Sequence, residues 1–311
     1  MKIDSLGLDQ ILPIFDRCFS QFAPTIRSLG LKATRCENVL QLVEFVCRFP
    51  HLDDLELITP RGSVDWTLAD APPGSQGPRP QQPLPFRGHL VLIGVGSFVQ
   101  RLLELPGGIR FRSIEADSQL QDLAEVLAAC SSTLEVLDIR CFESGKSSTL
   151  TRIRPLKDHW ARLGYSPNLR LRDRSDGLGS GEMLSVNLGC HGVLRRFELA
   201  VDFVELDILP PFVRETLASV SSPHFSEFSL RLCPRLGFSL WRGASDRRTF
   251  WGAGWEVVDE DLYVRATRRD GFRFAIQIVP GESKKAAVEA LFPRMKSLGS
   301  LLITKPQPWW R

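Results

Sequence analysis

Several features that would indicate a membrane protein or a nucleic-acid-binding protein are absent from this chain of 311 residues. No apolar run approaches the roughly 18 residues that a membrane-spanning helix requires, and the N-terminus, MKIDSLGLDQ, has no signal-peptide core. The net charge of +3 is small for this length and gives no global attraction to nucleic acid or to an anionic membrane. We therefore expect neither a nucleic-acid partner nor a membrane partner.

Patterns for disulfides, metals and catalysis are also lacking. The seven cysteines are odd in number and never spaced C-x-x-C, so we expect them to be reduced in an intracellular protein, cytoplasmic or nuclear. The five histidines include no H-E-x-x-H spacing, and we expect no metal site. No G-x-S-x-G sequence or other nucleophile–base pair is visible. The sequence therefore predicts a protein without catalytic residues and without a cofactor.

Two glycine-containing segments keep an enzyme as the alternative. In VLIGVGSFVQRLL, Gly94 and Gly96 stand between a predicted strand and a predicted helix, as in a dinucleotide-binding turn, but valine takes the place of the third glycine. In ESGKSST, the stretch Gly145-Lys146-Ser147 is similar to the end of a Walker A loop, but arginine takes the place of the first glycine. The alternative function is a nucleotide-binding α/β enzyme; an ordinary turn and a surface loop are the favoured interpretations.

The chain does contain a recurring apolar pattern, Leu-x-x-Leu-x-Leu. It occurs in HLDDLEL (51–57) and TLEVLDI (133–139), and several looser copies lie about 23 to 31 residues apart, which overlaps the leucine-rich-repeat range. Amphipathic helices such as SQLQDLAEVLAAC (118–130) are predicted between copies. A helix supplies the crossover that parallel strands need, and stacked neighbours bury the leucines. The pattern predicts an α/β fold: an irregular leucine-rich-repeat-like solenoid with a curved parallel sheet and outer helices.

Composition divides the chain into unequal parts. Residues 1–25 form an N-terminal segment, and residues 26–304 form the predicted solenoid. Within the solenoid we expect a disordered insertion at 60–86, because residues 71–85 are rich in proline, glycine and glutamine and cannot bury apolar area. A second irregular stretch is expected at 142–193, and residues 305–311 form a tail.

Three stretches carry a family resemblance: TIRSLGLKATRCENVLQLVEFVCRFPHLDDLEL, LAACSSTLEVLDI and PPFVRETLASVSSPHFSEFSLRL. They resemble the leucine-rich-repeat-like region of fungal F-box proteins, over roughly residues 25–304. The resemblance implies a protein–protein recognition scaffold, the substrate-recognition part of an SCF-type ubiquitin ligase. In that family an F-box docks on a Skp1-type adaptor. Residues 1–25 are too short for an F-box and are interpreted as a remnant, so we expect that adaptor as a partner only if an F-box is encoded upstream.

Alternation along the strands predicts a binding face. If the motif leucines point inward, the residues between them point outward. In successive strands these outward residues are Asp54, Glu56, Glu115, Asp117, Asp138, Arg140, Arg196, Glu198, Glu227 and Arg231. The first half of this concave face is acidic and the second half is mixed, which favours a basic protein partner. The alternative is that exposed strand positions are simply polar.

Overall fold

The computed structural model describes residues 1–34, 39–58, 86–93, 97–105, 107–117, 123–142, 186–202, 209–232, 254–278 and 282–305. The chain forms two compact units. Unit 1 comprises residues 1–140 and 191–199, and unit 2 comprises residues 141–190 and 200–311.

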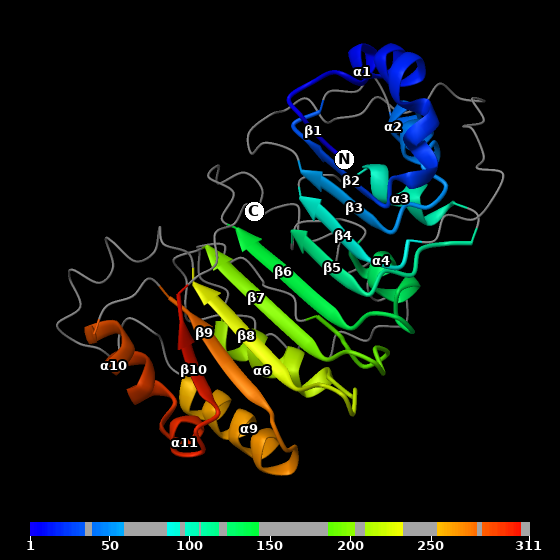
Figure 1. Ribbon diagram of the computed structural model, residues 1–311. Coiled ribbons are helices and arrows are strands. Elements are labelled where there is room, and N and C mark those ends of the chain that lie inside the picture. The colour runs from blue at the N-terminus through cyan, green and yellow to red at the C-terminus, as the bar shows by residue number, and fades with distance from the viewer. Residues whose placement is uncertain are drawn as a thin grey trace, which may run out of the picture. The chain divides into compact units, whose positions relative to one another are not determined.

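Ten strands form an open parallel sheet in which the strand order follows the chain (Figure 1). They are β1 (Lys2–Asp4), β2 (Ser28–Lys32), β3 (Asp54–Ile58), β4 (His89–Ile93), β5 (Ser113–Asp117), β6 (Val136–Phe142), β7 (Arg196–Asp202), β8 (Glu227–Leu232), β9 (Arg273–Gln277) and β10 (Leu301–Thr304). Strand order that follows chain order requires a crossover between every two neighbours. The predicted α/β fold with a parallel sheet is confirmed.

Helices occupy many of the crossovers. Unit 1 contains α1 (Leu8–Ile14), η1 (Phe15–Phe19), η2 (Ser20–Thr25), α2 (Val39–Cys47), α3 (Ser97–Leu103) and α4 (Leu123–Ala129). Unit 2 contains α6 (Leu209–Ser219), α9 (Trp255–Arg268), α10 (Glu282–Leu291) and α11 (Pro293–Ser297). Pro293 is the first residue of α11, which begins just after α10 ends. Among the helices that the structure describes, none has the length and apolar character needed to cross a bilayer.

The motif leucines of unit 1 form two buried ladders across neighbouring strands. One ladder consists of Leu29, Leu55, Leu90, Ile114 and Leu137, and the other of Leu31, Leu57, Leu92, Ala116 and Ile139. Each of these side chains is at most 1% exposed. Because burying one leucine stabilises the fold by roughly 1.5–3 kcal/mol, the ladders are the main apolar seam of the unit. The prediction that HLDDLEL and TLEVLDI are strands of one parallel sheet is confirmed.

A tight turn leads into several strands at the same place in the pattern. In each case the N–H of the first apolar motif residue donates to the carbonyl three residues earlier: Leu52 to Phe49, Leu194 to His191, Phe225 to Ser222 and Phe272 to Arg269, with N···O distances of 3.2, 3.2, 3.4 and 3.3 Å. The side chain at the start of the turn is buried in three of the four, at Phe49, His191 and Ser222. This position therefore belongs to the core even where it is polar.

In unit 2 an aromatic cluster lies against β8 and β9. Phe228 of β8 stacks on Phe274 of β9 with ring centroids 5.4 Å apart. Phe292, just before α11, packs on Phe274 at 4.9 Å and on Trp255 of α9 at 5.5 Å. All four rings are at most 1% exposed. The residues around α9 and α11 thus cover the face of these strands that corresponds to the leucine motif.

Two boundaries differ from the predicted ones. The sheet begins before residue 26, because residues 2–4 form β1 and pair with β2. Phe86, assigned above to the insertion 60–86, is fully buried with its ring 5.1 Å from that of Phe111, so it belongs to the core. Residues 60–85 of the insertion, 143–185 of the irregular stretch and 306–311 of the tail lie outside the described residues.

Candidate functional site

Opposite the leucine ladders, unit 1 carries a face of charged and polar side chains. Strands β3 and β5 alternate between half-buried and buried residues, so the residues between the motif leucines lie on the other face of the sheet. The polar face of unit 1 is defined here as Lys2, Gly30, Asp54, Glu56, His89, Ser113, Glu115, Asp117, Asp138, Arg140, Arg196 and Glu198. The other two predicted binding residues, Glu227 and Arg231, lie on β8 of unit 2.

The ten predicted binding residues are partly or fully buried and already make contacts within the chain. Each has at least one intramolecular hydrogen bond, ion pair or electrostatic contact. Arg140, Glu198 and Arg231 are only 8%, 1% and 7% exposed, whereas the other seven are half-buried. A partner would therefore meet side chains that already hold one another in place.

The first ion pair of the polar face spans three strands. Lys2 of β1, Gly30 of β2 and Glu56 of β3 lie in one register row. Lys2 Nζ is 3.5 Å from Glu56 Oε2, although a whole strand separates the two residues. The two side chains meet above Gly30, which has no side chain to keep them apart. The Lys2 side chain is 69% exposed, whereas the Glu56 side chain is half-buried at 33%.

Two further ion pairs are more deeply buried. Glu115 of β5 pairs with Arg140 of β6, and their side chains are 17% and 10% exposed. On β7, Arg196 Nη2 is 2.6 Å from Glu198 Oε2, and the Glu198 side chain is 2% exposed. Removing one partner of a buried pair leaves a desolvated charge, so these two pairs hold their geometry more firmly than an exposed pair.

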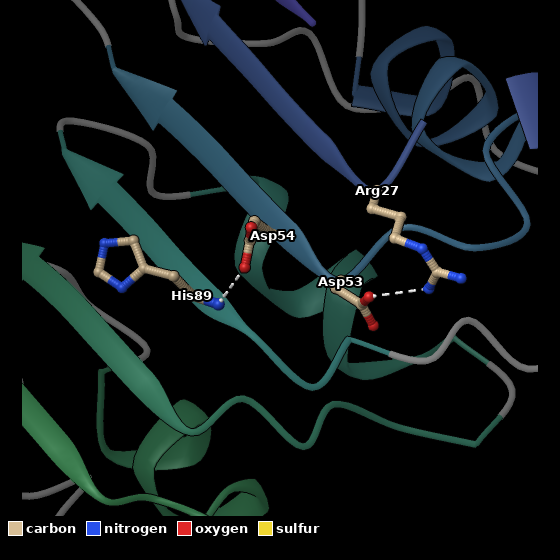
Figure 2. Close-up of polar contacts among 4 residues, drawn as sticks. All are labelled: Arg27, Asp53, Asp54 and His89. Atoms are coloured by element: carbon tan, nitrogen blue, oxygen red, sulfur yellow. Dashed lines mark hydrogen bonds and ion pairs between the residues drawn. The ribbon is translucent and has the colours of Figure 1, made fainter. Parts of the chain in front are cut away.

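Asp54 is held by the backbone of the next strand. Its carboxylate accepts a hydrogen bond from the backbone N–H of His89 at 2.8 Å, and the His89 ring points away from it (Figure 2). The carboxylate lies against the Cα of Gly88, where a Cβ would collide with it. At the preceding position, Arg27 Nη1 pairs with Asp53 Oδ2 at 3.2 Å. The missing side chain of Gly88 is therefore what allows Asp54 to reach β4.

His89 and Ser113 form a side-chain pair on adjacent strands. His89 Nδ1 lies 2.8 Å from Ser113 Oγ. Burial lowers the pKa of His89; the charges of Asp54 and Glu56 oppose this shift and Arg140 reinforces it. A serine nucleophile next to a neutral histidine is one part of a hydrolytic triad, but the third part requires a carboxylate on the histidine ring. Asp54 binds the His89 backbone instead, so the pair serves here as a cross-strand polar contact.

The equivalent face of unit 2 carries a buried polar pair. Gln277 Nε2 donates to Ser229 Oγ at 3.1 Å, and the two residues are 6% and 0% exposed. Ala275 of β9, the register partner of Ser229, is also buried. A hydrogen bond of this kind allows polar groups to be buried at small cost. This face of β8 and β9 is thus closed, unlike the polar face of unit 1.

Sequence reasoning missed four members of the polar face: Lys2, Gly30, His89 and Ser113. For His89 and Ser113 a signal was present, because both lie one residue before a buried motif position, as Asp54 does. Lys2 carried no such signal, since β1 is only three residues long. Gly30 lies one residue before the buried Leu31, but glycine has no side chain to classify as polar.

The patterns that favoured other chemistry gain no support. Gly94, Gly96 and the stretch Gly145-Lys146-Ser147 lie outside the described residues. Within the part of the chain that the structure describes, no group of three or more histidine, cysteine, aspartate and glutamate side chains could hold a metal ion. The polar face of unit 1 is therefore the candidate site with the most structural detail.

Comparison with known proteins adds no relative. No protein-family model, no curated protein and no solved structure matches the chain.

Proposed function

We propose that the chain is an irregular leucine-rich-repeat-like solenoid that recognises a protein partner, and that the polar face of unit 1 binds an extended basic segment of that partner. The observation that carries this proposal is the pre-organised charge of the face. The Glu115–Arg140 and Arg196–Glu198 ion pairs and the hydrogen bond of Asp54 fix side chains of this face before any partner arrives, and pre-organisation reduces the entropy lost on binding.

The sign of the charge supports a basic partner. The polar face contains six carboxylates, Asp54, Glu56, Glu115, Asp117, Asp138 and Glu198, and three cationic side chains, Lys2, Arg140 and Arg196. Burial favours the neutral form of His89, so it adds little positive charge near pH 7. The net negative field favours encounter with cations and disfavours acidic competitors.

The resemblance to fungal F-box proteins extends the proposal to a ubiquitin ligase of the SCF type, in which the recognised protein is a substrate. Co-purification of the natural full-length protein with a Skp1-type adaptor tests this extension. The extension can fail while partner recognition holds, because the polar face does not include the adaptor-binding module.

Peptide binding tests the recognition proposal directly. The probe is a fluorescein-labelled peptide of about twelve residues that alternates lysine and serine, since alternate residues of an extended chain point to one side. We expect binding that weakens with added salt and is absent for the matching glutamate–serine peptide. The double variant Asp117→Asn plus Asp138→Asn should weaken binding about tenfold by removing two negative charges.

A matched control lies on α9 of unit 2. Glu256→Gln plus Glu260→Gln removes the same net charge from exposed positions far from the polar face in the sequence. This variant should bind the lysine–serine peptide as the unchanged chain does. Equal losses for the two double variants would show attraction to net charge only, and no loss for either would remove the polar face from the proposal.

A further inference from the structure

Gly30 occupies a strand position whose backbone does not require glycine. It lies in the middle of β2, between the buried residues Leu29 and Leu31, and its φ is not positive. Any residue could adopt this extended conformation, and glycine in a strand interior weakens the strand. The reason for glycine therefore lies in the space above it. A Cβ there would be 3.3 Å from Glu56 Oε2 and 3.3 Å from Lys2 Cγ.

The space above Gly30 is filled by the two ends of a weak ion pair. The two side chains are 3.5 Å apart, and Lys2 is well exposed while Glu56 is one-third exposed, so the pair is of the kind that contributes little to stability. The Glu115–Arg140 and Glu198–Arg196 pairs differ, because in each the carboxylate is at most 17% exposed. Glu56 is thus the carboxylate of these three pairs that a cation from outside can reach most easily.

The residues next to Glu56 do not compete with it for a cation. Asp54, the neighbour of Glu56 on the same face of β3, is bound to the backbone of β4. Next to Glu56 in the register row, Val91 of β4 is 5% exposed and gives no competing polar group. A cationic side chain that approaches β2 and β3 therefore meets Glu56 first.

We infer that Lys2, Gly30 and Glu56 form a receiving site for one lysine or arginine side chain of the partner, and that Lys2 occupies this site in the free chain. The inference rests on the proposed function and names the part of the polar face that the partner contacts. Binding exchanges one cation for another at Glu56. Lys2 is a competitor in this exchange, and Gly30 keeps the space open.

Three substitutions should change the affinity for the lysine–serine peptide, two by weakening binding and one by strengthening it. Glu56→Gln should weaken binding about tenfold, because it removes the carboxylate that receives the cation. Lys2→Gln should strengthen binding about fivefold, the upper range for loss of an exposed ion pair. Gly30→Val should weaken binding because its side chain fills the space, although valine suits a strand better than glycine. Thermal melts of all three should stay close to that of the unchanged chain.

Lys305→Gln is the matched control for Lys2→Gln. Lys305 is exposed and follows β10 in unit 2, so its loss changes the net charge equally without touching Glu56. The control should strengthen binding much less than Lys2→Gln does. Weaker peptide binding by Lys2→Gln would show that the ion pair builds the site instead of blocking it, and would overturn the inference.

The experiments distinguish failure of the proposed function from failure of the receiving site formed by Lys2, Gly30 and Glu56. If the unchanged chain does not bind the peptide, the proposed function fails. If the chain binds the peptide and the Asp117→Asn plus Asp138→Asn variant weakens binding, but Glu56→Gln and Lys2→Gln have no effect, only the receiving site at Gly30 is overturned. Binding that rises with Lys2→Gln and falls with Glu56→Gln supports both.

Discussion

Unit 1 and unit 2 repeat the same strand-and-helix arrangement but bury their strands differently. In unit 1, β3 and β5 alternate between half-buried and buried residues, so one face of each strand stays accessible. In unit 2, β8 has five consecutive buried residues and β9 has four. Parallel strands are commonly covered on both faces. The difference shows that strands of one parallel sheet need not be equally open to a partner.

Strand β4 is an exception within unit 1, because it is more buried than β3 and β5 and in this respect is similar to the strands of unit 2. Its residues Val91 and Ile93 are buried on the polar face. The charged side chains of the polar face therefore fall into two groups, one around Lys2 and Glu56 and one around Glu115 and Asp138. An extended partner that crosses the strands would contact both groups with an apolar residue between them. Because the two groups are separated, we expect the removal of a single charge to affect binding differently in each group.

The largest expected effect is unfolding of the chain, and it tests the buried leucine positions that both units contain. Leu137→Asp in unit 1 and Leu230→Asp in unit 2 each place a charge at a position that is 0% exposed. The unpaired carboxylate should cost several kcal/mol in either unit, enough to unfold the chain. We expect insoluble protein from both variants in expression trials, whereas Ser132→Asp, at an exposed turn position, should remain soluble. Soluble, cooperatively melting Leu137→Asp protein would contradict the ladder.

The next prediction tests the difference between the units. Ala275→Asp introduces a carboxylate on the closed face of unit 2, where the residue is 7% exposed. Val136→Asp introduces the same group on the half-buried face of unit 1. We expect losses in the free energy of unfolding of about 3 kcal/mol for Ala275→Asp and about 1 kcal/mol for Val136→Asp, because only the first carboxylate loses most of its water. Denaturant titration measures both, and equal losses would mean that the faces are equally covered.

Strand periodicity could be predicted from the sequence because burial repeats along each strand. Leu55 and Leu57, or Leu137 and Ile139, are recognisable without knowing their neighbours. The closed face of unit 2 could not be predicted in this way. Strand β8 reads EFSLRL, with polar residues at alternate positions, which is typical of a strand with one exposed face. Strand β9 reads RFAIQ, with a polar residue at each end. Ser229 and Gln277 are buried nonetheless, and the hydrogen bond that Gln277 donates to Ser229 lowers the cost of burying them.

The candidate site shows the same limit. Asp54 and Glu56 were predicted to share a face, and alternation alone is enough to place them there. The pairing of Lys2 with Glu56 depends on the register of three strands, which no local pattern encodes. The role of Gly30 depends on that pairing in turn. Sequence thus predicts which side of a strand a residue takes, while the choice of cross-strand partner needs the assembled sheet.

The next expected effect is a loss of stability at acid pH, and it comes from one of the tight turns that lead into the strands. His191 in unit 1 holds the turn position that Phe49 holds earlier in the same unit, and burial lowers the pKa of His191 to about 4. The folded chain therefore binds this proton less readily than the unfolded chain, whose histidine titrates near pH 6.5. Stability should fall as the pH drops from about 6.5 toward 4, with a loss from this group of about 2 kcal/mol between pH 7 and pH 5.

The variant His191→Phe provides the comparison for this acid sensitivity. Phenylalanine suits a buried turn position, as Phe49 shows, and it does not titrate. Denaturant titrations at pH 7 and pH 5 should give a smaller difference for His191→Phe than for the unchanged chain. The turn of unit 2 that begins at Ser222 has no titrating side chain at this position, so it should not contribute. An unchanged pH difference would show that the His191 ring is hydrated in the folded chain.

The smallest expected effect separates two reasons for glycine, one in each unit. Gly88 of unit 1 leaves room for the Asp54 carboxylate, whereas Gly271 of unit 2 has a φ of +80°, which other residues adopt only with strain. Gly88→Ala and Gly271→Ala should each cost about 1 kcal/mol in the free energy of unfolding. The mechanism differs, because Gly88→Ala acts by displacing Asp54 from the His89 N–H, while Gly271→Ala acts on the backbone.

A double-mutant cycle distinguishes these mechanisms. In an Asp54→Ala background the hydrogen bond to His89 is already lost, so Gly88→Ala should cost much less than it does alone. Gly271→Ala should cost the same in both backgrounds, since nothing near it lies within 4 Å of an added Cβ. Additive losses for Gly88→Ala and Asp54→Ala would mean that the alanine methyl group strains the nearby Asp53 carbonyl, 3.2 Å away, and that the polar face does not depend on the space at Gly88.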